Sequence, residues 1–267
     1  MYKEIKINSL EEVFQLLNER SFEDNKKRYR SSCIYRGLSN SSYKLETSLR
    51  RNCYEKQTDL ECSLLRNFSK YAVSEDPAIE DSVWRQLILG QHHGLPTRLL
   101  DWTYSPLIGL HFAVSEKNLS KMDDHNCAVW QVDIKELHSR LPDPYKKVLK
   151  ENKAIIYTVK MLENVTDSLS QYDKDMSNES MLVVEPPSID PRIINQYSYF
   201  SVVPHGILDI EDFLATKTNK TIKYVISKDI RWAIRDMLDQ FNISERTVYP
   251  GLDGLSQMLA RHYFVRR

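Results

Sequence analysis

The stretch from Gln91 to Pro106 reads QHHGLPTRLLDWTYSP, and the expected fold and site both depend on it. It gathers two histidines, an arginine, an aspartate, a tryptophan and several hydroxyl groups in one turn-rich passage. The apolar run 107–114 follows directly. Polar groups of this kind are costly to bury unless each finds a hydrogen-bond partner. The passage is therefore either a solvated loop or a functional site.

Helical patterns lie on both sides of this stretch. Apolar residues recur every three or four positions across 58–92, with a break at Pro77. Ser105 suits the N-cap and Pro106 the first position of another helix. His111 would lie on the apolar face of that helix, where we expect a core histidine whose hydrogen bonds are satisfied.

The second half of the chain favours strands. Strand-like runs occur at 128–134, 154–157, 181–184, 199–203 and 221–226. Residues 161–180 are rich in Asn, Ser, Asp and Glu, which predicts a mobile excursion. Residues 228–241 predict the last helix, because apolar side chains recur there at helical spacing.

The N-terminal region reads as a lead-in to the core. Residues 2–8 predict a short strand, and Ser9 begins a capping box for the helix that follows. Residues 20–30 are charged and polar, which indicates a loop or a fraying helix end. Cys33–Tyr35 predicts a buried strand that is closed by Arg36-Gly37, with a turn beyond it.

These elements predict one α+β domain with a helical N-terminal part. The chain has 267 residues and shows no internal repeat or low-complexity linker. We therefore expect a single domain over 1–267, with 1–30 as the lead-in and 31–267 as the core.

Composition narrows the class of protein. Lys+Arg and Asp+Glu both number 37, so no net charge attracts the chain to nucleic acid, although local basic clusters exist. The four cysteines have neither CxxC spacing nor a disulfide framework, and an apolar N-terminal signal region is lacking. No run approaches the roughly 20 apolar residues of a membrane span. These features predict a cytoplasmic protein without a membrane partner.

Several segments together resemble the FRG domain family, named for its Phe/Tyr-Arg-Gly signature. They are Tyr35-Arg36-Gly37, the stretch 93–103 (HGLPTRLLDWT), 192–196 with Phe200, and 249–255. This resemblance covers nearly the whole chain. The family usually has a glycine after the glutamine of its Arg-Ile-x-x-Gln motif, whereas this chain has Tyr197-Ser198.

The order of these segments is also similar to that of arginine-class ADP-ribosyltransferases. Those enzymes place Tyr-Arg-Gly on a first strand, a Ser/Thr motif before a Ser-Pro helix, and a polar or acidic residue on a later strand. Here 35–37, 103–113 and Gln196 follow that order. The likeness implies a split β-sheet core, NAD as the substrate, and ADP-ribose transfer without a metal.

The site residues that we expect can also be argued from chemistry. Cleavage of NAD needs a cation for its diphosphate, a fixed ribose and stabilisation of a cationic transition state. We expect Arg36, Asp101, Thr103, Gln196 and His93 as catalytic residues. We expect the cofactor to contact Tyr35, Arg36, Gly37, Trp102, Tyr104 and Ser105.

The acidic residue of the ADP-ribosyltransferase pattern has no direct counterpart in this chain. ADP-ribosyltransferases usually present a glutamate to the ribose, whereas Gln196 is neutral. Glu185, beside the strand at 181–184, is the substitute. Structural roles stay open as well: Arg36 can pair with Asp101 inside the fold, and Trp102 can belong to the core.

Three functions follow as hypotheses. The first is a toxin or effector of bacterial defence, or of a toxin–antitoxin pair, that transfers ADP-ribose from NAD to a macromolecule. A nucleic acid, RNA in particular, is favoured as this acceptor, with protein second. The second is a metal-independent nuclease in which His92, His93 and Asp101 act as acid and base. The third is a non-catalytic module that binds a nucleotide or a partner. A metal site is not expected, because adjacent histidines diverge on regular elements.

Overall fold

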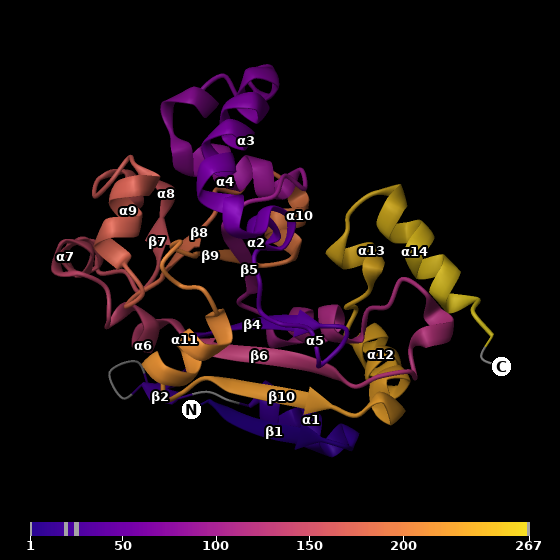
Figure 1. Cartoon of the computed structure of the whole chain (residues 1–267). Coiled ribbons are helices and arrows are strands. Elements are labelled where there is room, and N and C mark those ends of the chain that lie inside the picture. Colours follow the sequence, from indigo (N-terminus) through magenta and orange to yellow (C-terminus); the bar gives the residue numbers. More distant parts are fainter. Residues whose placement is uncertain (1, 19–20, 24–26, 266–267) are drawn as a thin grey trace.

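A computed structural model describes residues 2–18, 21–23 and 27–265 as a mixed eight-stranded sheet covered by helices (Figure 1). The strands lie in the order β1 (Lys3–Ile7), β10 (Ile222–Ile226), β6 (Cys127–Asp133), β4 (Cys33–Leu38), β5 (Leu99–Thr103), β9 (Ser198–Val202), β8 (Leu182–Glu185) and β7 (Tyr157–Thr158). The outermost pairs, β1 with β10 and β7 with β8, are parallel, and the pairs between them are antiparallel. A separate hairpin joins β2 (Ser21–Glu23) and β3 (Arg28–Arg30). The mixed α and β composition agrees with the sequence.

The sheet divides in the middle, between β4 and β5. These strands share one registered pair, Tyr35 with Thr103. Beyond it, Arg36–Leu38 pairs with β6, while Leu99–Trp102 pairs with β9. The sheet therefore consists of two halves that meet at a single point.

Helices cover the first half on one face. They are α1 (Leu10–Leu17), α5 (Pro106–Val114) and α12 (Arg231–Gln240). Buried side chains of β1, β4, β6 and β10 pack against them. Ser105 caps α5 by accepting the N–H of Ile108, and Pro106 occupies the first turn, as the sequence predicts.

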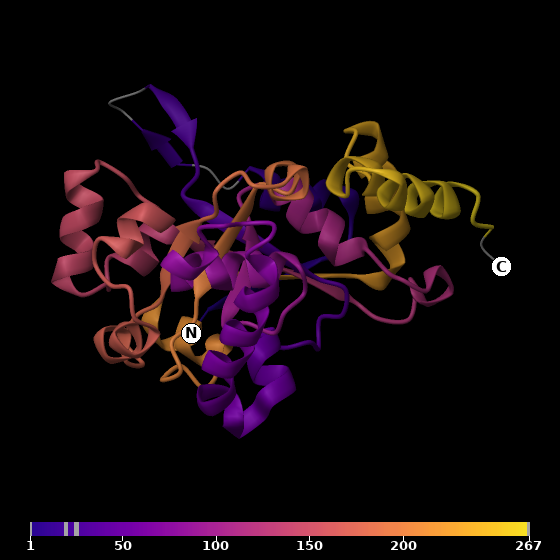
Figure 2. The same ribbon diagram turned by 90° about the horizontal axis from the view of Figure 1, so that it is seen from above.

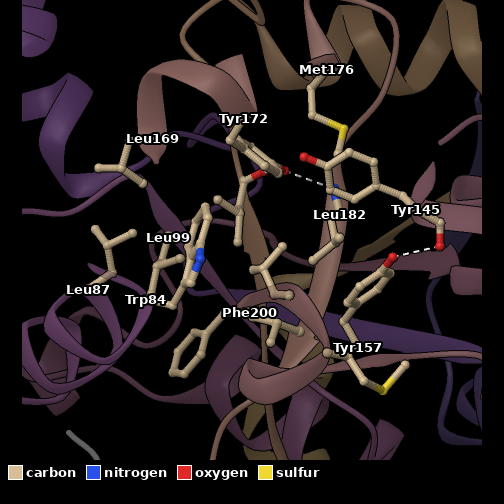
Figure 3. Packing of buried hydrophobic residues seen from close by; sticks show 14 of the residues in the cluster. Trp84, Leu87, Leu99, Tyr145, Tyr157, Leu169, Tyr172, Met176, Leu182 and Phe200 are labelled. Carbon is tan, nitrogen blue, oxygen red and sulfur yellow. Dashed lines mark hydrogen bonds between the residues drawn. The ribbon is translucent and has the colours of Figure 1, made fainter. Parts of the chain in front are cut away.

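The second half has its own core, rich in aromatic rings (Figure 3). The helices around it are α3 (Gln57–Ala72), α4 (Val83–His92), α7 (Asp143–Glu151), α8 (Val159–Glu163) and α9 (Leu169–Met176). Buried tyrosine hydroxyls here make hydrogen bonds: Tyr157 donates to the carbonyl of Tyr145 at 2.6 Å, and Tyr172 accepts the N–H of Leu182 at 3.2 Å. Each polar handle thus finds a partner inside the apolar cluster.

The remaining elements complete the molecule. A third apolar cluster lies beside β4, β5 and β6 and includes Trp102, Trp130 and Phe213. Helices α6 (Ile134–His138) and α11 (Ile210–Lys217) pack on it. The shorter helical segments are α2 (Ser48–Cys53), η1 (Tyr54–Lys56), η2 (Ile79–Asp81), η3 (Leu119–Lys121), α10 (Pro191–Asn195) and η4 (Lys228–Ile230). The chain ends with α13 (Glu245–Val248) and α14 (Leu252–His262), which lie together to one side of the molecule (Figures 1 and 2).

Several expectations for secondary structure were wrong. Residues 161–180 include the end of α8 and the whole of α9 rather than forming a mobile excursion, because Leu169, Tyr172 and Met176 are buried in the second core. The strand expected at 154–157 is reduced to β7, which retains only Tyr157 of that range.

Two further corrections concern the chain ends. The helix at 228–241 is not the last one, since α13 and α14 follow it. Of the loop or helix end expected at 20–30, residues 21–23 and 28–30 form the hairpin β2–β3, and residues 20 and 24–26 lie outside the described part.

His138 ties the two halves together in its neutral form. Its Nδ1 lies 2.9 Å from the carbonyl oxygen of Ile155, and its Nε2 accepts the N–H of Val183 at 2.9 Å. The accepting Nε2 places the ring proton on Nδ1. Burial lowers the pKa of His138 to about 4, because a charged ring loses its hydration there.

This burial predicts acid sensitivity. Between pH 6.5 and about 4, the unfolded chain protonates His138 and the folded chain does not, so stability falls as the pH falls. The loss approaches about 1.4 kcal/mol per pH unit for this one group. Urea unfolding at pH 7, 6 and 5 should show a smaller pH dependence in His138→Gln than in the wild type. An unchanged dependence would contradict the assignment.

Candidate functional site

A pocket of about 1040 Å³ opens where β4 and β5 diverge. Its floor comes from these two strands and its sides from the end of α5, from α10 and β9, and from α13 and α14. The lining includes Tyr35, Arg36, Gly37, Tyr43, Gln91, Asp101, Trp102, Thr103, Phe112, Lys117, Arg192, Gln196, Ser198, Glu245, Tyr249, Gln257 and Arg261. Segments expected to meet from three distant parts of the sequence therefore line one cavity.

Arg36 spans the divergence between the strands. Its Nη1 donates to the main-chain carbonyl of Asp101 at 2.6 Å and lies 3.4 Å from the carboxylate Oδ2. Its Nε is buried without a hydrogen-bond partner among the described residues. Burial lowers the pKa of Arg36, and the neighbouring Asp101 opposes this shift. The pairing of Arg36 with Asp101 thus exists, and it leaves part of the guanidinium uncommitted.

Asp101 is held from the other side by Gln91. The amide Nε2 of Gln91 donates to both carboxylate oxygens of Asp101 at 3.0 Å. The Oε1 of Gln91 in turn accepts the hydroxyl of Thr97, which is fully buried, at 2.5 Å. This chain of bonds fixes the amide orientation of Gln91 and holds the carboxylate in place while 53 % of the Asp101 side chain stays exposed.

Arg98, in the middle of the same motif, is buried elsewhere. It pairs with Glu61 through two nitrogens and with Asp173 at 2.7 Å, and His205 lies 3.2 Å from Glu61. These partners raise the pKa of Arg98 despite the opposing effect of burial. Arg98 therefore anchors α3 and α9 to β5 rather than facing the pocket described above.

Thr103, Trp102 and Gln196 line the pocket but also hold the walls together. The Thr103 hydroxyl donates to the main-chain carbonyl of Gln196 at 2.7 Å. The Trp102 indole is 4 % exposed, packs in the third cluster and donates to the hydroxyl of Ser201 at 3.0 Å. The Gln196 side chain donates to the carbonyl of Val248 at 3.3 Å. The motif order implied that Gln196 lies on a strand. In the structure it instead caps the C-terminal end of α10.

Tyr35 and Gly37 shape the floor. The Tyr35 side chain is 2 % exposed and packs in the first core. A Cβ placed on Gly37 would lie 2.2 Å from the carbonyl oxygen of Gly109 and 2.3 Å from the amide nitrogen of Ala113. Because no side chain fits there, glycine lets α5 approach β4 closely.

The C-terminal wall of the pocket, formed by α13 and α14, was predicted only in part. Arg261 pairs with Glu245 and Asp239 at distances from 2.7 to 3.1 Å, and Arg235 lies 2.6 Å from Glu245. The guanidinium of Arg192 stands 5.2 Å from the ring centroid of Tyr249. The sequence singled out 249–255 and 192–196, but carried no signal for Glu245.

Behind this wall lies His111, which is fully buried as expected. Its Nδ1 is 2.8 Å from the Nη1 of Arg235, whereas its Nε2 has no partner among the described residues. The expectation that its hydrogen bonds are all satisfied was therefore wrong for one nitrogen. Burial, and then the charge of Arg235, lowers the pKa of His111 to about 3, so the ring is neutral.

Some expected site residues lie outside the pocket lining. His93 pairs with Glu75 at 3.3 Å, and Ser105 serves as the cap of α5. Tyr104 is half exposed and contacts other tyrosines. Glu185, at the end of β8, does not line the pocket either.

Tyr197, which follows Gln196, has an unusual backbone conformation. Its φ is 49°, in the left-handed region that glycine adopts easily and tyrosine adopts at a cost. This is the position directly after Gln196 where the family usually has glycine. A glycine at this position would adopt the same turn without that cost.

No group of three or more His, Cys, Asp or Glu side chains within the described ranges is arranged to hold a metal ion. In the same ranges, no helix has the length and apolar character that crossing a bilayer requires.

The match to a protein family includes both strands of the pocket floor, β4 and β5. Residues 31–122 match the model of the FRG domain. This stretch is therefore similar to the FRG domain. It contains 35–37 and 93–103, while α10, α13 and α14 of the pocket lie beyond the match. Comparisons with curated proteins and with solved structures found no significant match.

The close approach at Gly37 predicts a structural role for the signature of the FRG domain. Gly37→Ala should lower the free energy of unfolding by about 3 kcal/mol, because backbone atoms of α5 must move. Gly94→Ala is the control: φ there is 82° with no atom within 4 Å of the added Cβ, so about 1 kcal/mol of backbone cost is expected. Urea unfolding compares the two. Equal losses would show that packing against α5 is not the constraint.

Proposed function

We propose that this chain is an ADP-ribosyltransferase that transfers ADP-ribose from NAD to a macromolecule at the pocket between β4 and β5. The observation that carries the proposal is the meeting of three separate segments, 35–37, 101–103 and 192–196, around one cavity. The cavity is of the size that ligand sites usually have.

Cations on two walls support a diphosphate ligand. Arg36 contributes from the floor, with 21 % of its side chain exposed, and Arg192 contributes from α10. Lys117 adds a third positive charge after α5. A planar guanidinium binds phosphate oxygens through two parallel hydrogen bonds, which an ammonium group cannot match. We assign Arg36 to the diphosphate, with Arg192 as its counterpart.

The proposed reaction breaks the bond between the ribose C1′ and the nicotinamide nitrogen and joins C1′ to a nucleophile of the acceptor. Nicotinamide leaves with the bonding electrons, and the acceptor loses a proton. Asp101 is the proposed proton acceptor, since Gln91 and Arg36 hold its carboxylate while half of it stays exposed. Tyr249 and Phe112 offer aromatic faces for the bases of NAD.

The missing glutamate is proposed to be replaced by Gln196. Gln196 lines the pocket and Glu185 does not, which favours the glutamine. Glu245 also lines the pocket, but Arg235 and Arg261 engage its carboxylate and lower its pKa against the effect of burial. We therefore assign Glu245 to holding the wall and Gln196 to a ribose hydroxyl.

The acceptor is proposed to be RNA or DNA rather than protein, and an antitoxin protein is the expected partner if the chain acts as a toxin. The nuclease hypothesis receives less support, because His92 pairs with Asp190 at 3.6 Å and His93 with Glu75, both away from the lining. A non-catalytic nucleotide-binding module is the alternative that the experiment below separates.

The test measures nicotinamide release from labelled NAD, with cell lysate as the source of acceptor. Arg36→Ala should lower the rate by about 100-fold, the scale seen when one hydrogen-bond donor to the transition state is removed, and Arg36→Lys should restore only part of it. Arg66→Ala, on the exposed surface of α3, is the matched control and should leave the rate unchanged.

Three outcomes are distinguishable. Label on nucleic acid or protein that depends on Arg36 supports transfer. Tight NAD binding without nicotinamide release identifies a binding module instead. RNA shortening without NAD points to the nuclease and contradicts the proposal.

A further inference from the structure

Three tyrosines form a cluster beside the pocket that the proposed NAD chemistry does not use. Tyr104 follows β5, Tyr199 lies in β9, and Tyr197 stands in the turn before β9. The ring centroid of Tyr104 is 6.1 Å from that of Tyr197 and 6.4 Å from that of Tyr199. Tyr104 and Tyr197 are 49 % and 54 % exposed, so two large aromatic faces meet the solvent together.

The backbone holds this cluster against a conformational cost. Tyr197 keeps a φ of 49° although tyrosine disfavours that region, and its carbonyl accepts the N–H of Tyr104 at 3.0 Å. Strained residues of this kind tend to occur at functional sites. A glycine would give the same turn without strain. What tyrosine adds at this position is therefore its aromatic ring.

The cluster adjoins the pocket along the chain. Gln196 and Ser198, the neighbours of Tyr197 in the chain, both line it, and so does Thr103, which precedes Tyr104. The tyrosines are therefore carried by the same ends of β5 and β9 that supply Thr103 and Ser198 to the pocket wall. Arg192 lines the same wall from α10.

We infer that Tyr104, Tyr197 and Tyr199 form a stacking platform for an unpaired nucleobase of a single-stranded nucleic acid acceptor. The inference rests on the proposed function and names the acceptor class of the same site. Exposed aromatic faces bind bases by stacking with little dependence on sequence, because every base has a π face. A duplex keeps its bases paired and cannot use such a platform.

The charges around the platform fit a base better than a phosphate. Glu185 is near enough to contribute, after burial, to raising the pKa of Tyr199 to about 12. A carboxylate repels phosphate oxygens, whereas the arginines lie on the pocket side. The strand would thus place a base on the tyrosines and its backbone toward Arg192 and Arg36.

The test is the affinity for labelled single strands of RNA and of DNA about 12 nucleotides long, within the usual site sizes, measured by fluorescence anisotropy. Tyr197→Gly removes the ring and the strain together, so the fold is kept and urea unfolding should show no loss of stability. Its affinity should fall about tenfold or more. Tyr197→Phe should stay within about twofold of the wild type, since the stacking face is kept.

Tyr54→Gly is the matched control. Tyr54 is likewise an exposed tyrosine in the left-handed region, with a φ of 48°, but it caps α2 and does not line the pocket. Its replacement should leave the affinity for single strands unchanged. RNA binding tighter than DNA, or the reverse, identifies which strand is the acceptor.

The platform and the NAD chemistry can fail separately. Tyr197→Gly should still release nicotinamide from NAD in the absence of acceptor, because Tyr197 does not line the pocket. If single strands do not bind the wild type, or bind Tyr197→Gly as tightly, the platform is wrong whatever NAD does. Label found on protein alone overturns it as well.

Discussion

The structure depends on the way in which β4 and β5 part after the pair Tyr35–Thr103. Two strands that diverge leave backbone groups and space between them, and Arg36 occupies that space by donating to the carbonyl of Asp101. A partly buried cation requires such partners, because a guanidinium stripped of water is costly to leave unpaired. One residue thus closes the gap in the sheet and presents charge to the pocket that the gap creates.

Ion-pair networks fix helices on both halves of the sheet. Arg98 with Glu61 and Asp173 anchors α3 and α9, while Arg261 with Glu245 and Asp239 anchors the C-terminal helices. Buried pairs of this kind add little net stability, but removing one partner leaves an uncompensated charge. They therefore hold these helices in one arrangement, and they differ in that way from Asp101, whose side chain stays half exposed.

The sequence predicted the features that depend on local periodicity or on recognisable motifs. The cap at Ser105, the strand at 128–134 and the meeting of 35–37 with 101–103 and Gln196 could all be predicted from patterns or motifs. The buried role of Arg98 could not, because its partners lie far away in the chain and no spacing identifies them. The same holds for Glu245, and for α9, where buried Tyr172 overrides a polar composition. The strain at Tyr197 is a property of the turn that tertiary contacts impose.

The central claim is that the divergence of β4 and β5 creates an NAD site. Its most direct measurement is photolabelling of the wild type with NAD that carries an azido group on adenine, followed by mass spectrometry of the peptides. We expect label within segments that line the pocket, 35–43, 112–119 and 245–261, and competition by unmodified NAD. Label confined to other surfaces, or label that unmodified NAD does not displace, would contradict the claim.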